Sequence, residues 1–536
     1  MEPVPTAPAK ESSYPAWVEN TARLRAAELE EIRDHCREMI EKPVFAVFVR
    51  GTAAPEGWNL TLASLKRQIY PHWNLHLLGA PAPVSPSPDV TVAATVDWDA
   101  LSADFAVFVE AGDVLAADCL YEFASEINRD PAGDLLYANE DRRTASGERH
   151  TPFFKPAWSP DYLESLPYIG HAACFRVSIA AGCPFADFHD FLLRFTEKTR
   201  RIAHLEKVLY HRADSRPLPS PEIGTAAIRG RLERTGRQGE IVTHGRGAYF
   251  EIVPRLRRAP LVSIVIPTAG GIASLRGSQV NLIENCVTSI REKSTYSAYE
   301  FVIVHDGGLP ASTLALLQEH QCRLVHYGES PLNLSRKLNQ GAAQAQGEYL
   351  ILMNDDIEVI TPDWIERMLA HFEKEATGVV GCKLLGENGK VRHAGVVNNF
   401  GLPVQVSQGV SSDDPGYFHS LQSVRNYIAV SGACCMTPHR LFAELGGYEE
   451  KLGLCFNDVD YCLRVAARGL TRLCDCFVKM LHLESPVRAP KEIPQEQDLY
   501  FRLSWPTQLG DDPYYDQGHL SMKAHHWKFS VEHHQL

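Results

Sequence analysis

The sequence predicts an α/β protein with two similar domains in tandem, each built on a mostly parallel sheet that helices cover on both faces. Apolar, β-branched runs alternate with helix-forming segments along most of the chain, as in parallel sheets whose strands are connected by helices. Several segments recur in the same order in the two halves. The 536 residues also exceed what one hydrophobic core usually holds.

The first 42 residues are predicted to form a helical arm. Charged, helix-forming residues from position 14 onward are interspersed with apolar side chains such as Leu24 and Ile32, which indicates an amphipathic helix over residues 14–42. Pro43 then opens the run PVFAVFV, which predicts the first strand of a domain that we assign to residues 43–212.

A second domain is predicted at residues 257–490. Its first strand is LVSIVIPTAGG, a β-branched run that follows a basic stretch and ends at a proline and two glycines. Residues 213–256, which begin with a polar segment rich in Arg, Gly, Pro and Ser, are predicted to link the domains. Residues 491–536 are assigned to a C-terminal tail, which we expect to pack on the second domain, although its Trp527 and Phe529 could also touch a membrane or a partner.

The internal repeat predicts a duplicated fold. SLKRQIYPHWNLHLL in the first half parallels SIREKSTYSAYEFVIV in the second, and in both a helix, a turn with a tyrosine and a strand follow one another. FLLRF with Arg194 parallels YCLRV with Arg464, and VLYHR with His211 parallels KMLHL with His482. The offset between matched residues grows along the chain, which indicates insertions in the second copy.

Acidic residues follow one predicted strand of the second domain. The apolar run YLILM stops at Asn354, Asp355 and Asp356, although ionised carboxylates are among the groups least often buried. Ligands of such sheets bind beyond the carboxyl ends of the strands, so we expect these groups at a ligand site. Taken alone, the tripeptide would favour a solvated turn, and the motifs around it favour the site.

In these motifs the second half resembles the family-two glycosyltransferases, whose fold is called GT-A. LVSIVIPTAGG resembles the family's opening strand, and NQGAAQAQGEYLILMNDD resembles the helix and strand that lead to its D-x-D region. VSGACCMTPHRLFAELGGYEEKLGLCFNDVDYCLR resembles the acceptor-side segment, and LHLES resembles the closing histidine element. YPHWNLHLL, LLYANEDRRTASGERHTPFFKPAWSPDYL and HLEKVLYHR resemble the first domain of tandem transferases that build bacterial surface polysaccharides of the O-antigen type. The resemblance implies two tandem GT-A-like domains.

The resemblance also implies a nucleotide-sugar donor and a divalent cation, Mn²⁺ or Mg²⁺, that neutralises the donor's diphosphate. Asp356 matches the second acid of the D-x-D pattern, and His482 matches a position that can complete the metal site, so both are expected to bind the metal. Asn354 stands where the first acid would be. The expected donor contacts are Thr268, Asp306, Arg336, Asn339, Asn354 and Asp355.

Asp458, within FNDVDYCLR, matches the family's general base. A carboxylate there would take the proton of the acceptor hydroxyl while its oxygen attacks the anomeric carbon opposite the leaving group, which inverts the anomeric configuration. The resemblance places His393 and Asn457 near the acceptor. Asp460 and Arg464, four residues apart, are expected to form a structural ion pair.

The first domain is predicted to keep the fold in degenerate form, without transferase activity. By its motifs, Glu110-Ala111-Gly112 replaces the D-x-D region, Phe188 replaces Asp458, and the strand that would contact the nucleotide ends without an acid. Loss of a metal ligand, a nucleotide contact and a base together leaves little route to the chemistry.

The expected function is the inverting, metal-dependent transfer of a sugar, of the hexosyl type, from a nucleotide-sugar donor to a glycan or lipid-linked saccharide in polysaccharide biosynthesis. A non-catalytic glycan-binding or scaffolding protein is an alternative, because His305, Asn354 and Asn457 stand where the family has acids. A sugar nucleotidyltransferase is another alternative. That class needs a glycine-rich basic loop after the first strand, and PTAGGIASLRG is a faint version of one.

The composition fits a globular protein and narrows its partners. Hydrophobic residues make up 45% of the chain, and the formal net charge of −13 argues against nucleic-acid binding through a general basic field. No run approaches the ~18 apolar residues of a membrane span, and the first residues show no signal-peptide core. Thirteen cysteines without a CxxC spacing indicate reduced thiols. We therefore expect a cytoplasmic protein, with peripheral contact at the inner face of the membrane as one option.

Overall fold

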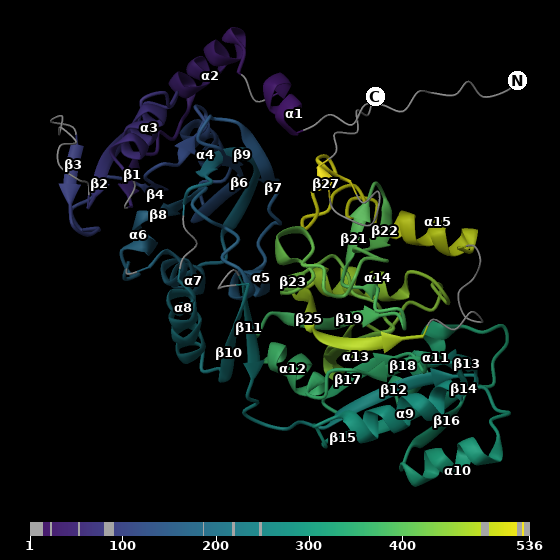
Figure 1. The fold of residues 1–536 in the computed structure, drawn as a ribbon. Helices are drawn as coiled ribbons and strands as arrows, with labels where there is room; N and C mark the ends of the chain where they lie inside the picture. The colour runs from purple at the N-terminus through teal and green to yellow at the C-terminus, as the bar shows by residue number, and fades with distance from the viewer. Residues whose placement is uncertain are drawn as a thin grey trace, which may run out of the picture.

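The computed structural model describes residues 14–21, 24–51, 54–79, 90–185, 187–216, 220–245, 249–483, 493–521 and 528–529. It contains two α/β domains that lie side by side, the first coloured purple through blue to teal and the second teal through green to yellow (Figure 1). Each domain is built around one large sheet in which most of the neighbouring central strands are parallel. The predicted fold class is confirmed.

The sheet of the first domain contains nine strands. They are β1 (Phe45–Arg50), β2 (Trp73–Leu78), β3 (Val90–Ala93), β4 (Phe105–Glu110), β5 (Val114–Leu115), β6 (Leu135–Arg143), β7 (Arg149–Phe153), β8 (Ala173–Arg176) and β9 (Ile202–Ala213). The helices of this domain are α3 (Pro55–Leu65), α4 (Cys119–Arg129), α5 (Pro160–Ser165), α6 (Val177–Ala180) and α7 (Phe188–Lys198).

The sheet of the second domain contains ten strands. They are β12 (Val262–Thr268), β15 (Tyr299–His305), β16 (Arg323–His326), β17 (Tyr349–Met353), β18 (Ile357–Val359), β19 (Thr377–Leu385), β20 (Val391–His393), β23 (Val424–Asn426), β24 (Cys434–Pro438) and β25 (Thr471–His482). Two hairpins form separate two-stranded sheets, β13 (Ile272–Leu275) with β14 (Ser278–Asn281), and β21 (Val396–Asn399) with β22 (Leu402–Gln405). The helices are α9 (Leu282–Lys293), α10 (Ala311–Glu319), α11 (Leu334–Ala342), α12 (Trp364–Ala370), α13 (His439–Glu444) and α14 (Asn457–Ala467), with short 3₁₀ turns at His371–Glu373 and Tyr417–His419.

The two sheets have the same strand order. The first runs β3-β2-β1-β4-β8-β6-β9-β5, and the second runs β16-β15-β12-β17-β24-β19-β25-β18. The strand directions also agree, because β8 and β24 are each antiparallel to both neighbours, while the strands before them are parallel to one another. The repeat in the sequence is therefore a repeat of the fold.

The central strands are buried along their length, as their continuous apolar runs predict. Every residue of β12 is buried, and the first five residues of β1 are buried as well. Sheets covered on both faces by helices select such runs rather than alternating patterns. In the part of the chain that the structure describes, no helix is both long and apolar enough to cross a bilayer.

The N-terminal arm forms two helices instead of the single predicted one, α1 (Tyr14–Thr21) and α2 (Ala26–Glu38). The backbone N–H of Arg25 donates to Glu28 Oε2 at 2.6 Å, which starts a new helix at Ala26. Tyr14 is buried and donates its hydroxyl to Asp141 Oδ2 at 2.7 Å. Because Cys36 joins the core of the first domain, the arm is part of that domain's packing.

The segment predicted as a linker, residues 213–256, is largely folded. It carries α8 (Pro221–Arg234) and a hairpin of β10 (Gly239–His244) and β11 (Tyr249–Pro254). Ile228 and Phe250 belong to the apolar core that α7 also lines. The sequence did not indicate this 14-residue helix, because its composition is polar and only Gly224, Ala227, Ile228 and Leu232 are buried.

The C-terminal tail contains α15 (Gln495–Ser504) and the short strands β26 (Leu520–Ser521) and β27 (Lys528–Phe529). Phe501 of α15 stacks on Phe456 of the second domain with ring centroids 4.6 Å apart. His519 stacks on Phe154 of the first domain at 4.8 Å. The tail therefore contacts both domains. Trp527, for which the sequence leaves a membrane or partner contact open, lies outside the described residues.

A buried polar interface joins the two domains. Asp161 of α5 forms an ion pair with Lys374 and accepts a hydrogen bond from Asn426 Nδ2 at 2.8 Å. Close by, Phe153 stacks on Phe418 with ring centroids 3.7 Å apart. These contacts join α5 and the end of β7 to Lys374, to β23 and to the 3₁₀ turn that precedes β23.

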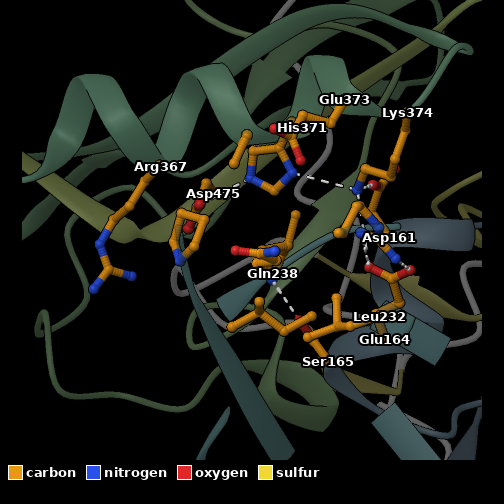
Figure 2. A pocket seen from close by; sticks show the side chains of 15 residues that line it. Asp161, Glu164, Ser165, Leu232, Gln238, Arg367, His371, Glu373, Lys374 and Asp475 are labelled. Atoms are coloured by element: carbon orange, nitrogen blue, oxygen red, sulfur yellow. Dashed lines mark hydrogen bonds and ion pairs between the residues drawn. The ribbon is translucent and has the colours of Figure 1, made fainter. Parts of the chain in front are cut away.

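A pocket opens at this interface between α5 and the hairpin of β10 and β11 on one side and α12 on the other (Figure 2). Its charged groups are paired, since Arg237 donates to Glu164 at 2.5 Å and His371 Nε2 lies 3.0 Å from Asp475 Oδ2. The residues that follow β12, β15 and β17 do not line this pocket. It is therefore a feature of the domain junction, separate from the predicted ligand site.

Replacing Asp161 by Asn tests the ionic part of this junction. Burial alone would raise the pKa of Asp161, but the charges of Lys374 and His371 outweigh it and hold the pKa below its ordinary value. An acid with a lowered pKa stabilises the fold above its ordinary pKa of about 3.9, and this stability is lost as the pH falls toward the folded value. We expect Asp161→Asn to lower the free energy of unfolding by about 3–5 kcal/mol at pH 7.

The difference between wild type and Asp161→Asn should shrink as the pH falls below about 4, because both chains then carry a neutral group there. Urea unfolding at a series of pH values measures this difference. A loss that stays the same from pH 7 to pH 3 would mean that Asp161 acts through shape and not through charge.

Candidate functional site

The polar residues that follow three parallel strands lie at one edge of the second sheet. β12 pairs with β15 and with β17, and Thr268 at the end of β12 lies opposite His305 at the end of β15. β17 ends at Met353, and Asn354, Asp355 and Asp356 follow directly. Parallel strands bring their carboxyl ends to the same edge, which is where ligands of such sheets bind.

Asp355 is tied to the first strand. Thr268 Oγ1 donates to Asp355 Oδ2 at 2.6 Å, and both residues are fully buried. This hydrogen bond connects the turn after β17 to the end of β12 and fixes the direction of the next residue, Asp356.

Asp356 and His482 come together although 125 residues lie between them in the sequence numbering, roughly a quarter of the chain. β18 pairs with β25 so that Ile357 lies opposite His482. His482 Nε2 is 3.4 Å from Asp356 Oδ1, and the two side chains are 16% and 3% exposed. A carboxylate oxygen and an imidazole nitrogen at this separation could bind one divalent cation together.

Asp356 and His482 fit a cation that the protein and a substrate would bind together, rather than one that protein side chains alone would surround. Among the residues that the structure describes, no three His, Cys, Asp or Glu side chains are arranged to hold a metal ion. Mg²⁺ is commonly held by one or two carboxylates, while water and the phosphate oxygens of a substrate supply its other ligands. Asp356 with His482 matches that pattern, and a bound diphosphate would complete it.

Lys337 is the basic residue that reaches this edge of the sheet. Its Nζ donates to the backbone oxygen of Thr268 at 2.8 Å and to Asp306 Oδ1 at 2.6 Å, and only 2% of the residue is exposed. The sequence carried a signal for this placement, because Lys337 lies three residues after Leu334 and four before Gly341 on one face of α11. The resemblance predicts donor contacts at Arg336 and Asn339; Lys337 forms a basic pair with Arg336 in NLSRKLNQGA, and it is the member of this pair that reaches the edge.

Arg336 and Asn339 have other partners. Arg336 is exposed and pairs with Glu450 at 2.8 Å and with Glu329. The amide of Asn339 bonds to both backbone groups of Tyr448, donating to its oxygen at 2.9 Å and accepting from its N–H at 2.8 Å. These contacts fix α11 against the loop after α13.

The loop of residues 431–433 connects the acidic turn to the predicted base. The N–H of Asn354 donates to the backbone oxygen of Ala433 at 3.0 Å. One residue earlier, the N–H of Gly432 donates to Asp458 Oδ2 at 2.8 Å. A Cβ atom at Gly432 would stand 3.2 Å from Asp458 Cβ, so glycine permits this close approach.

Asp458 lies in the first turn of α14 and is half-buried. Burial raises the pKa of its carboxyl, while hydrogen bonds from the N–H groups of Gly432 and Val459 work in the opposite direction. A carboxylate with a raised pKa binds a proton more readily than an ordinary aspartate, as a general base requires. Asp460, two residues on, pairs with Arg464 at 2.8 Å, in line with the expected structural role.

His393 supports the same loop. Its Nε2 accepts the N–H of Ser431 at 3.1 Å, and its Nδ1 pairs with Gln405 Oε1. Burial lowers the pKa of His393 to about 4, and its neighbour His482 acts in the same direction. His393 is therefore neutral near pH 7, and both ring nitrogens are engaged.

Asn457 and Asp306 complete the set of predicted residues. Asn457 is buried, and its Nδ2 donates to Ser335 Oγ at 3.0 Å. Asp306 keeps 37% of its side chain exposed beside Lys337. At the neighbouring position, His305 Nδ1 accepts the N–H of Gly307 at 3.2 Å. The structure thus places six of the predicted residues at the carboxyl ends of the strands: Thr268, Asp306, Asn354, Asp355, Asp356 and His482. Asp458, in α14, is connected to them through the loop 431–433. Arg336 and Asn339 make other contacts.

The equivalent edge of the first domain corrects one prediction. β5 pairs with β9 so that Val114 lies opposite His211, as Ile357 lies opposite His482. The residue before Val114 is Asp113, so Asp113 takes the place of Asp356. The prediction that the first copy lacks this acid is wrong, because strand β4 has six residues where β17 has five, which moves the acid one position further along than the motif alignment assumed.

Comparison with known proteins agrees with the geometry of the second domain. Residues 263–446 match the family described as Glycosyl transferase family 2. The chain is 30% identical over 569 residues to the O-antigen biosynthesis protein RfbC of Myxococcus xanthus, covering 97% of this chain and 43% of that protein. It is 31% identical over 438 residues to the protein y4gI of Sinorhizobium fredii (strain NBRC 101917 / NGR234), covering 75% of this chain and 47% of that protein. The chain spans less than half the length of these two relatives.

Two solved structures are also similar. The mannosyltransferase PcManGT from Pyrobaculum calidifontis, in complex with GDP-Man and Mn²⁺, is 15% identical with a TM-score of 0.31, over 51% of this chain and 66% of that one. GalNAc-T7 with UDP, GalNAc and Mn²⁺ is 14% identical with a TM-score of 0.37, over 51% of this chain and 52% of that one. On the family match and the relatives, the chain contains a glycosyl transferase family 2 domain at residues 263–446.

Proposed function

We propose that the second domain is an inverting, metal-dependent glycosyltransferase that moves a sugar from a nucleotide-sugar donor to a hydroxyl group of a glycan or lipid-linked saccharide. The observation that carries the proposal is the loop 431–433, which contacts the acidic turn at Asn354 and the carboxylate of Asp458. An inverting displacement needs a leaving-group site and a base on opposite sides of one anomeric carbon, and this loop joins the two candidates. The relative named for O-antigen biosynthesis supports an acceptor in polysaccharide assembly.

In this proposal Asp356 and His482 hold Mn²⁺ or Mg²⁺. The ion would neutralise charge on the diphosphate and so improve it as a leaving group. Asp355, bonded to Thr268, sets the direction of the turn, and Asn354 holds the turn to the loop through its backbone N–H. These contacts keep the metal ligands in place before the donor binds, which reduces the cost of ordering them.

Asp306 and Lys337 form the proposed contact with the nucleoside part of the donor. The ion pair orients Asp306 at the end of β15. A carboxylate in that place can accept a hydrogen bond from a ribose hydroxyl or from a base N–H. Arg336 and Asn339 act indirectly in this proposal, because their polar groups hold α11 in position.

Asp458 is the proposed base. Its two oxygens each accept a backbone N–H, from Gly432 and from Val459, which fixes the carboxylate without neutralising it. It would take the proton of the acceptor hydroxyl as the new glycosidic bond forms and the bond to the diphosphate breaks. Neutral His393 keeps the loop next to it in place, and Asn457 joins the start of α14 to α11.

A screen of nucleotide-sugars by thermal unfolding, with and without Mn²⁺, tests the donor part of this proposal. Ligands that bind the folded state raise its stability by mass action, so a true donor should raise the melting temperature only when the ion is present. If no nucleotide-sugar in the screen shifts the melting temperature with Mn²⁺, the alternative of a glycan-binding or scaffolding protein gains weight.

Replacing Lys337 by Met is expected to weaken the binding of the donor nucleotide about 10- to 100-fold. The reason is that Asp306 and the end of β12 lose a charged hydrogen-bond partner, and such bonds contribute about 1.5–3 kcal/mol. The measurement is calorimetric titration with UDP, GDP, CDP and dTDP in the presence of Mn²⁺.

Arg336→Met is the matched control, since it removes a cation at the next position that pairs with exposed acids. We expect it to change nucleotide affinity less than about twofold, as is usual for surface ion pairs. Equal losses in the two variants would mean that the helix, and not the Lys337 ammonium group, supports the nucleotide.

A further inference from the structure

The buried acid of the first domain has a built-in cation. Asp113 is fully buried and takes the place of Asp356 in the strand pairing. Arg216 Nη1 donates to Asp113 Oδ2 at 2.8 Å, so a guanidinium stands where the second domain presents Asp356 to His482. The hydroxyl of Tyr210 donates to the same oxygen at 2.6 Å.

Arg216 also contacts the other polar groups of this edge. Its Nη2 donates to His171 Nε2 at 2.5 Å and lies 3.9 Å from Glu110 Oε1. Glu110 is the last residue of β4, and its Oε1 lies 3.7 Å from His171 Nε2. The guanidinium thus contacts a carboxylate and an imidazole, which are ligand types that bind Mn²⁺ and Mg²⁺. Glu110 lies farther away and pairs more closely with Arg50, whose Nε donates to Glu110 Oε1 at 2.6 Å.

His211, the residue of the first domain that corresponds to the proposed metal ligand His482, has a different partner. His211 is the counterpart of His482, yet its Nδ1 lies 2.7 Å from Asp141 Oδ1. Asp141 also accepts from Arg149 Nε at 2.6 Å. With His211 held in this second cluster, Arg216 is the cation that balances Asp113.

The base side of the first domain is closed as well. Asp190 pairs with Arg194 in α7 as Asp460 pairs with Arg464 in α14, which aligns Phe188 with Asp458. The ring of Phe188 stacks on His171 with centroids 4.0 Å apart. An aromatic ring therefore covers the imidazole that contacts Arg216, in the place where the second domain carries its proposed base.

We infer that Arg216 replaces the divalent cation in the first domain, so that this domain carries its own counter-ion and the described chain has a single metal site, in the second domain. The comparison of Asp113 and Arg216 with Asp356 and His482 rests on the proposed function of the second domain. The claim about Arg216 itself rests on the contacts of Asp113, Glu110 and His171.

Removing the guanidinium distinguishes a replaced cation from an ordinary salt bridge. Asp113 and His171 contact two nitrogens of the same guanidinium, so its removal leaves both facing one space. Glu110, which lies beside His171, keeps Arg50 as its partner. If Arg216 replaces a divalent cation, the position that its guanidinium leaves should then bind one. An ordinary salt bridge should leave only an unpaired acid.

The experiment uses the full chain, Mn²⁺ alone as the probe, and Asp356→Ala as a background that removes the proposed metal site of the second domain. Bound Mn²⁺ is counted by electron paramagnetic resonance, and melting curves are recorded with and without Mn²⁺. We expect the Asp356→Ala chain to bind no Mn²⁺. Adding Arg216→Ser should create one Mn²⁺ site and a Mn²⁺-dependent rise in melting temperature of about 5 °C at saturating ion.

Two further variants make the result specific. Arg176→Ser is the matched control, because Arg176 pairs with Asp134 of the same domain at 2.9 Å with similar exposure, away from Asp113. It should gain no Mn²⁺ site. Adding Asp113→Asn to the Arg216→Ser chain should abolish the new site. If the Arg216→Ser chain does not fold alone, refolding with Mn²⁺ should recover it, whereas Arg176→Ser should show no such recovery.

Two results would overturn the inference. One is a Mn²⁺ ion bound to the Asp356→Ala chain with Arg216 intact and lost on Asp113→Asn, since the guanidinium would then not fill the place. The other is the absence of any Mn²⁺ effect on the Arg216→Ser chain, in binding or refolding. A wild-type chain that binds no Mn²⁺ would count against the proposed metal site of the second domain and leave the Arg216 result to stand by itself.

Discussion

Replacing Asp458 by Asn is expected to lower the rate of sugar transfer by about 10²–10⁴-fold, the usual contribution of a placed general base. Asn keeps the shape of the side chain and can still accept the N–H of Gly432, but it cannot take the proton of the acceptor hydroxyl. Donor affinity should hardly change, because in the proposed mechanism Asp458 acts on the acceptor hydroxyl and not on the diphosphate. A loss confined to the chemical step is typical of an interaction made mainly in the transition state.

The pH dependence gives a second view of the same residue. Since burial raises the pKa of Asp458, the rate should fall as the pH drops through a value above that of an ordinary aspartate, because the protonated acid cannot act as a base. The measurement is the rate of nucleoside diphosphate release against pH in the wild type. A rate that stays constant down to pH 4 would speak against Asp458 as the titrating base.

Asp460→Asn is the matched control for Asp458→Asn. Asp460 lies on the same turn of α14, pairs with Arg464 and accepts the indole N–H of Trp505 at 2.9 Å. We expect this change to lower the melting temperature. The rate of sugar transfer by the folded variant should stay within about threefold of the wild-type rate, because Asp460 takes no part in the proposed transfer step. Full turnover in Asp458→Asn would remove Asp458 from the mechanism.

Replacing Asp356 by Ala should remove Mn²⁺-supported donor binding while the protein stays folded. Changes to groups that only orient a metal ligand commonly cost about 10–100-fold in metal affinity, so loss of a direct ligand should cost at least about 100-fold. Calorimetric titration of Mn²⁺ with UDP or GDP measures the effect, and a melting curve checks the fold. Asp363→Ala is the control, because Asp363 pairs with Arg367 at the start of α12.

Unchanged Mn²⁺-dependent affinity in folded Asp356→Ala would remove this carboxylate from the metal site. The result would also bear on His482, which approaches the described acids of the site only through Asp356 at 3.4 Å.

The sequence was enough to predict the duplicated α/β fold and the acidic turn after β17. Continuous apolar runs mark buried parallel strands, and parallel strands bring their carboxyl ends together, so a polar tripeptide after such a run is informative. The pairing of Asp356 with His482 needed the motif resemblance, since the register of β18 against β25 sets it and no local pattern shows it.

Other features depended on tertiary contacts. Arg336 and Lys337 are adjacent in sequence, and only the packing of α11 decides which ammonium or guanidinium group reaches Thr268. The motif alignment missed Asp113 because strand β4 is one residue longer than β17, which strand pairing reveals and composition does not. The sequence did not predict helix α8, because its composition is polar and its few apolar residues are buried only where the helix packs against α7.

The most direct test of the central claim is the release of nucleoside diphosphate from a panel of nucleotide-sugars by the wild-type chain with Mn²⁺, beside Asp356→Ala and Asp458→Asn. We expect at least one donor to yield free nucleoside diphosphate with the wild type, and both variants to lose that release while remaining folded. Release of pyrophosphate in place of nucleoside diphosphate would contradict the account in favour of a nucleotidyltransferase. Release that is equal in the wild type and both variants would show that the strand edge of the second domain is not the site of the reaction.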